Sequence, residues 1–177
     1  KSFKAKLFVT FENNISCNYE AKIRTHGDLK DHIYYKDGKV FQSLDVRLSD
    51  GQINNITKFK LFLKGTKGKE EDEIFMTEVL REFDFISPRT NLVKVEMNGE
   101  KLEMLFQEKI TKELLEFHKR REGPIFEGEE KYMMDKASKI QNNPDVNWSE
   151  IFRVSEIGST IQLAKQTNSS WSVKNLI

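Results

Sequence analysis

The chain has 177 residues, of which 37% are hydrophobic, 11% aromatic and 32% charged. This composition is typical of a globular protein with a sizeable core and excludes a disordered chain. The 29 Lys and Arg residues balance 28 Asp and Glu residues, and the net charge of +1 gives no global argument for binding nucleic acid or an anionic membrane. The single cysteine, Cys17, excludes an internal disulfide, and no apolar run approaches the roughly 20 residues of a membrane span.

The sequence begins with an antiparallel hairpin. Apolar residues hold the odd positions of 3–11 and again those of 15–23, and the turn Glu12-Asn13-Asn14 separates the two runs. Such an alternation predicts two strands with one polar face. Cys17 falls on the apolar face, where we expect it to be a small buried hydrophobic residue.

Two further strands are predicted before the first helix. The stretch 24–39 is polar and resembles a loop. A third strand then runs from Val40 to Leu48, with its mostly apolar side formed by Val40, Gln42, Leu44, Val46 and Leu48. A fourth strand covers Thr57 to Lys64, and its lysines share the polar side: Lys58, Lys60 and Lys64.

The period changes after position 69. From Glu70 to Phe85 the apolar residues Phe75, Val79 and Phe83 recur four apart, which predicts a helix. Four acidic residues open it, where the helix dipole favours negative charge. A second hairpin follows from Leu92 to Ile110, folded over the Asn98-Gly99 pair, since both central positions of its turn require positive φ.

The rest of the sequence is predicted to be mostly helical, with helices at 112–122, 131–142 and 148–165. The expected fold class is α+β: an antiparallel strand-rich part with a main helix and a hairpin, followed by a mostly helical C-terminal part. We divide the chain into a strand-rich region, 1–110, and a helical region, 111–177, which we expect to be the start of a second lobe or an incomplete domain. Because the sequence begins with Lys1, we expect it to be a piece of a longer protein.

Few segments carry a recognisable chemistry. The glycine-rich run 65–69 lacks the spacing of a phosphate-binding loop and reads as a surface turn. His26, Asp28, Asp31 and His32 are possible metal ligands, but their spacing matches no known metal site and we predict none. A cation on a strand that faces a glutamate on a neighbouring helix is a way to hold phosphates, and Arg47, Lys60 and Glu78 could form such a set. The alternative is that these charges only meet water.

Several segments in order resemble the spore-coat-protein-H family of atypical kinases (CotH-like). KIRTHGD at Lys22–Asp28 looks like that family's IRGNS-type stretch, and LDVRLSDG at Leu44–Gly51 looks like its YRIKLD-type strand. KFKLFL at Lys58–Leu63 is similar to the strand that opens its next unit. The segment Glu73–Ile110 has the closest pattern: a helix, a Pro-Arg-Thr turn, a strand, Asn-Gly, a strand and a polar exit. The resemblance covers about half of the chain.

The resemblance implies the smaller, strand-rich lobe of a kinase-like fold that transfers phosphate from ATP with Mg²⁺. It would assign nucleotide binding to five residues, with the last two near the adenine between the lobes: Arg47, Lys60, Glu78, Gln107 and Glu108. The implied partners are a nucleotide and a protein substrate, with no nucleic acid.

The chain departs from the family in two ways. Arg47 stands where the family tends to show lysine, and the acidic metal-binding and catalytic motifs of the second lobe are not recognisable. We therefore expect a fragment or divergent member of this family. The alternative is a non-catalytic binding or scaffold module with the same fold.

Overall fold

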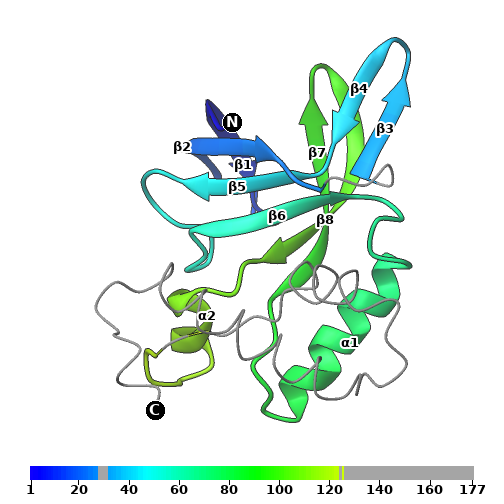
Figure 1. The fold of residues 1–177 in the computed structure, drawn as a ribbon. Helices are drawn as coiled ribbons and strands as arrows, with labels where there is room; N and C mark the ends of the chain where they lie inside the picture. Colours follow the sequence, from blue (N-terminus) through cyan, green and yellow to red (C-terminus); the bar gives the residue numbers. More distant parts are fainter. Residues whose placement is uncertain (28–31, 124, 126–177) are drawn as a thin grey trace, which may run out of the picture. The chain divides into compact units, whose positions relative to one another are not determined.

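The computed structural model describes residues 1–27, 32–123 and 125, and one compact unit runs from Lys1 to Arg121. This unit has an α+β fold dominated by antiparallel strands, as the sequence predicts (Figure 1). The elements in chain order are β1 (Phe3–Thr10), β2 (Ser16–Thr25), β3 (Ile33–Lys36), β4 (Lys39–Gln42), β5 (Leu44–Leu48), β6 (Lys58–Leu63), α1 (Glu70–Glu82), β7 (Thr90–Met97), β8 (Glu100–Glu108) and α2 (Lys112–Phe117). The helices predicted at 131–142 and 148–165 lie outside the described residues. Neither α1 nor α2 is long and apolar enough to cross a membrane.

Six strands form one antiparallel sheet in the order β1-β2-β5-β6-β8-β7. Its core collects buried residues from the central strands, together with partly buried ones from both edges, such as Leu7 on β1 and Val93 on β7. Because residues at opposite edges pack against the same cluster, the sheet curls around its apolar side. The other side carries the polar positions of the alternation, and it is the side on which the candidate site lies.

The second predicted hairpin is confirmed. β7 pairs with β8 so that Met97 lies opposite Glu100, and the two residues between them have positive φ, 54° at Asn98 and 79° at Gly99. These are the conformations that a two-residue turn of this type requires, and asparagine and glycine adopt them at the least cost. The turn therefore fixes the register of β8 and with it the position of Gln107.

The predicted third strand is wrong in one respect, because the chain breaks at Ser43 into β4 and β5. β4 leaves the large sheet and pairs with β3, a strand inside the stretch that the sequence suggested was a loop. Ser43 is fully buried, and its hydroxyl accepts a hydrogen bond from the Leu63 backbone N–H at 3.0 Å. The break also reverses the alternation, so that Phe41 is buried whereas Val40 is 57% exposed.

The apolar stripe correctly predicted helix α1, but the stripe is not its buried side. Phe75, Met76 and Phe83 are more than half exposed, whereas Glu70 and Thr77 are buried. Polar contacts hold the helix instead. The Glu70 carboxylate accepts a hydrogen bond from the Gly65 N–H, and the Ser87 hydroxyl donates to the Thr77 carbonyl at 2.9 Å.

Candidate functional site

Two lysines converge on one aromatic ring at the polar side of the sheet. The Nζ atom of Lys60, on β6, lies 5.7 Å from the centroid of the Phe62 ring, and Nζ of Lys67, in the loop before α1, lies 5.3 Å from the same centroid. Phe62 is almost fully buried, so the ring fixes both positions against the sheet. The two ammonium groups place positive charge around this ring, which favours an anion over a cation there.

A glutamine across the strand from Lys60 is hydrogen-bonded to helix α1. Gln107 on β8 lies directly opposite Lys60 on β6, so that the two side chains share a face of the sheet. The Gln107 amide Nε2 donates a hydrogen bond of 2.7 Å to the Glu73 carboxylate, in the first turn of α1. Lys60 on β6, Gln107 on β8 and Glu73 on α1 therefore lie in this order in space.

Asp45 supplies a fixed negative charge beside Lys60. It lies opposite Lys60 on the other neighbouring strand, β5, and its side chain is only 8% exposed. Burial alone would raise the pKa of the Asp45 carboxyl, but hydrogen bonds from Lys109, at 3.0 Å, and Arg24, at 2.8 Å, hold it below its usual range. Asp45 is therefore ionised at neutral pH, and it orients two cations beside the site.

A histidine also borders the site. The His26 ring lies edge-on to Phe62, with 5.4 Å between the ring centroids, and edge-on to His32 at the same distance. Burial lowers the pKa of His26 to about 4, and the positive charge of Lys60 acts in the same direction. Asp28 and Asp31 lie outside the described residues, and no three His, Cys, Asp or Glu side chains gather to hold a metal ion in the part of the chain that the structure describes.

The pKa of His26 predicts an acid-dependent loss of stability. The folded protein keeps His26 neutral down to about pH 4, whereas the unfolded chain takes up the proton near pH 6.5. This contribution is therefore complete above pH 6.5 and is lost as the pH falls towards 4. Because the side chain is partly exposed, we expect it to be on the order of 1 kcal/mol. Urea unfolding at pH 7, 5.5 and 4.5 measures it, and His26→Asn should reduce the slope of stability against pH. An equal slope in wild type and variant would contradict this origin.

Three of the predicted site residues lie on the polar side of the sheet. Lys60 and Gln107 are direct neighbours across β6 and β8. Arg47 on β5 is exposed and lies one cross-strand row away, opposite Lys58 and not opposite Lys60. Lys60 and Gln107 are therefore cross-strand neighbours, whereas the cross-strand neighbours of Arg47 are the cations Lys22 and Lys58.

The other two predicted residues bind partners elsewhere. The Glu78 carboxylate accepts hydrogen bonds from Arg81, three residues further along the same helix, at 2.9 Å. Glu108 follows Gln107 on β8, so its side chain points to the opposite face of the strand. There it is buried in a two-point ion pair with Arg89, with 2.8 Å for both nitrogen–oxygen contacts.

Sequence reasoning missed Glu73 and set Lys67 aside. Glu73 belongs to the acidic first turn of α1, where the helix dipole already explains a carboxylate, and only the hydrogen bond to Gln107 distinguishes it from its neighbours. Lys67 lies in the glycine-rich run that resembles a turn. The glycines on both sides of Lys67 are the signal that could have identified it. They allow backbone conformations in which the lysine side chain lies against the preceding strand.

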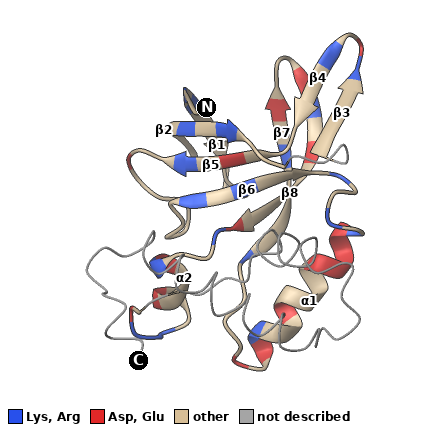
Figure 2. Ribbon diagram, in the orientation of Figure 1, with Lys and Arg blue, Asp and Glu red and all other residues tan. Residues whose placement is uncertain are grey.

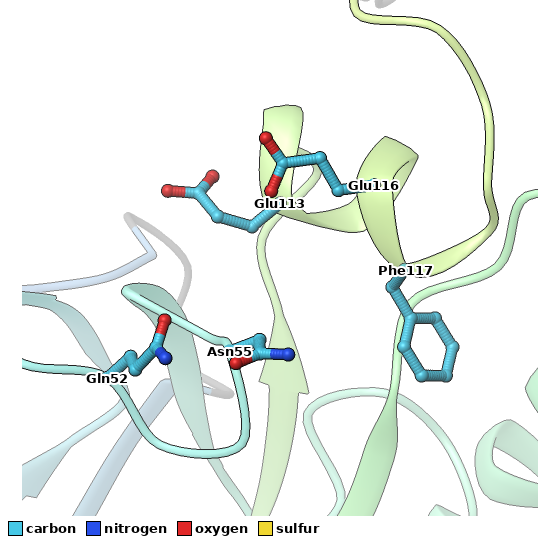
Figure 3. Close-up of a pocket in the computed structure, with 5 residues that line it drawn as sticks. All are labelled: Gln52, Asn55, Glu113, Glu116 and Phe117. Carbon is cyan, nitrogen blue, oxygen red and sulfur yellow. The ribbon is translucent and has the colours of Figure 1, made fainter.

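A separate open pocket lies between the β5–β6 loop and α2 (Figure 3). It is lined by Gln52, Asn55, Glu113, Glu116 and Phe117. Burial would raise the pKa of Glu113, but hydrogen bonds that include one from the Thr57 hydroxyl, at 2.8 Å, keep it lowered. Two carboxylates line this pocket without a basic side chain, and it therefore does not suit an anion.

These features define an antiparallel α+β unit in which two lysines lie near a buried ring and a glutamine–glutamate hydrogen bond links the sheet to helix α1. Comparisons with protein-family models, with curated proteins and with solved structures gave no match.

Proposed function

We propose that residues 1–121 form the nucleotide-binding lobe of a kinase-like protein similar to the CotH-like atypical kinases, and that Lys60 holds phosphates of ATP. One observation carries the proposal. Lys60 lies opposite Gln107, whose amide is bound to Glu73 on the helix that follows the strand of Lys60.

Protein kinases use a related arrangement. A lysine on a strand contacts the phosphates of ATP, and a glutamate on the next helix positions that lysine. In this chain the order is β6, with Lys60, and then α1, with Glu73. Lys67 lies between them in sequence and contributes a second cation near the Phe62 ring. A triphosphate needs more than one cation to balance its charge, and this pair provides two.

The residues of the site suit phosphate groups and not a metal ion. Mg²⁺, when bound with ATP, neutralises charge on the phosphates and is held by carboxylates. Within residues 1–27, 32–123 and 125 no suitable group of acidic or histidine side chains exists. The proposal therefore gives these residues the role of binding and orienting the nucleotide and assigns none of them as a metal ligand. A protein substrate is the phosphate acceptor that this class of function implies.

Calorimetric titration of Mg-ATP into the 177-residue chain tests the proposal. We expect saturable binding that Lys60→Gln weakens by about tenfold or more, because a charge-assisted hydrogen bond contributes about 1.5–3 kcal/mol. Glu73→Ala should weaken binding in the same direction, because it removes the acceptor that holds the Gln107 amide. Lys64→Gln is the matched control, since Lys64 directly follows β6 and its ammonium group is ion-paired with Glu103 at 3.2 Å.

The competing function is a binding or scaffold module that keeps the fold without the nucleotide. The lack of a carboxylate cluster in the described residues favours it. Absence of Mg-ATP binding by the wild-type chain would support this module, as would equal losses in the Lys60 and Lys64 variants. Mg-AMP serves as the control for binding that does not depend on the phosphate chain.

A further inference from the structure

A row of basic residues crosses the polar side of the sheet. Lys4 on β1 lies opposite Lys22 on β2, Lys22 lies opposite Arg47 on β5, and Arg47 lies opposite Lys58 on β6. Figure 2 shows the basic segments of β2, β5 and β6 beside one another. Directly opposite residues of antiparallel strands share a face, so these four side chains, called the basic row below, project from the same side.

The basic row is only partly neutralised: the positive charge of Lys58 is the smallest of several causes that lower the pKa of Glu113. In the described part of the chain, none of its four members takes part in a salt bridge. The two acids on this face of β1, β2, β5 and β6 are paired with other cations: Glu20 with Lys6, and Asp45 with Arg24 and Lys109. Like charges at directly opposite positions destabilise a sheet, so the row costs folding stability.

The surroundings strengthen the local charge. On the polar face of β1, β2, β5 and β6, seven basic side chains stand against two acidic ones, whereas the whole chain has a net charge of +1. Three members of the row are exposed and Lys58 is partly buried. The row is therefore accessible to a ligand and lies in a positive local field.

We propose that the basic row binds a ligand with several closely spaced phosphate groups, laid across β1, β2, β5 and β6. Neighbouring strands are about 4.8 Å apart, so each phosphate group of such a ligand lies within reach of two cations of the row. An extended acidic peptide presents one carboxylate every ~6.8 Å on the same side, and it therefore brings less negative charge to each pair of cations. Single-stranded nucleic acid needs aromatic rings for its bases, and on the described part of this face the exposed ring is that of Phe8.

Titration of inorganic tripolyphosphate into the 177-residue chain, at constant ionic strength, tests the proposal. We expect saturable binding in wild type and a loss of about tenfold or more in affinity with Arg47→Gln, which removes the central cation. Lys94→Gln is the matched control, because Lys94 is exposed on the same face but lies opposite Glu103; its affinity should stay within about twofold.

A second measurement does not depend on the ligand. Arg47→Gln removes a like charge between Lys22 and Lys58, so its melting temperature without ligand should rise above that of wild type. A variant that is more stable and binds more weakly is the expected signature of a binding site. A lower melting temperature together with wild-type affinity would overturn the proposal.

The test separates this row from the proposed nucleotide site. Lys60→Gln should weaken Mg-ATP binding by about tenfold or more, while its affinity for tripolyphosphate falls by less than about threefold. If Lys60→Gln loses tripolyphosphate and Arg47→Gln keeps it, the phosphates bind at the nucleotide site, and the proposal for the row is wrong. Binding of an oligothymidylate without binding of tripolyphosphate would also overturn it, in favour of a nucleic-acid surface.

Discussion

Replacement of Arg89 by alanine is expected to lower the free energy of unfolding by about 3–5 kcal/mol. Its partner Glu108 is almost completely buried, with a side chain 1% exposed, and the two form a two-point ion pair at 2.8 Å. The Arg89 guanidinium also donates to the Asn54 carbonyl and lies 4.3 Å from the centroid of the Phe117 ring. Alanine therefore leaves a buried carboxylate without its counter-ion and removes the link between β8, a loop and α2. Urea unfolding followed by circular dichroism measures the change.

A surface ion pair in the same chain provides the control. Arg120 and Asp84 are also in close contact, at 2.6 Å, but their side chains are 44% and 80% exposed. Water and ions screen such a pair, so Arg120→Ala should cost no more than about 1 kcal/mol. Replacing both buried partners together, as Arg89→Met with Glu108→Leu, should be less damaging than Arg89→Ala alone, since no charge is left unpaired. If Arg89→Ala and Arg120→Ala were equally mild, burial would not be the reason for the strength of the pair.

The polar end of β8 shows what a sequence can and cannot predict about a site. The pattern correctly placed a polar exit after the apolar residues of this strand, and the resemblance to the CotH-like kinases implied nucleotide binding for both Gln107 and Glu108. Adjacent strand residues point to opposite faces, however, so the two have different roles. Gln107 reaches Glu73 beside Lys60, whereas Glu108 holds Arg89 in the interior. Which face of β8 is buried depends on the order of the strands in the sheet. The local sequence pattern of β8 does not determine that order.

Helix α1 illustrates the same limit. Its period and acidic start were sufficient to predict a helix, because these depend on neighbours in sequence. The side of the helix that is buried was not predictable from the apolar pattern. The buried residues of α1 are Glu70 and Thr77, which form hydrogen bonds, whereas its large apolar residues Phe75 and Met76 are exposed. A choice based on the apolar stripe therefore selected Glu78 as the phosphate-site partner, and the residue that the structure brings to Gln107 is Glu73.

The second large effect concerns β4, where the alternation was misread. Phe41 is 1% exposed and belongs to the central core, although it sits on a short strand outside the large sheet. We expect Phe41→Ala to lower the free energy of unfolding by about 3–5 kcal/mol, because the ring leaves a cavity among residues that cannot fully collapse into it. Differential scanning calorimetry and urea unfolding should both report the loss.

The adjacent residue supplies a control that also tests the register. Val40 is 57% exposed on the opposite side of β4, and Val40→Ala should change the free energy of unfolding by no more than about 0.5 kcal/mol. A continuous strand from Val40 to Leu48, as the alternation alone predicts, would give the reverse order, with Val40 inside and Phe41 outside. The two variants therefore decide whether the chain breaks at Ser43. Since that break ends β4 and starts β5, the same pair of measurements tests the register that puts Asp45 opposite Lys60 and Arg47 in the basic row.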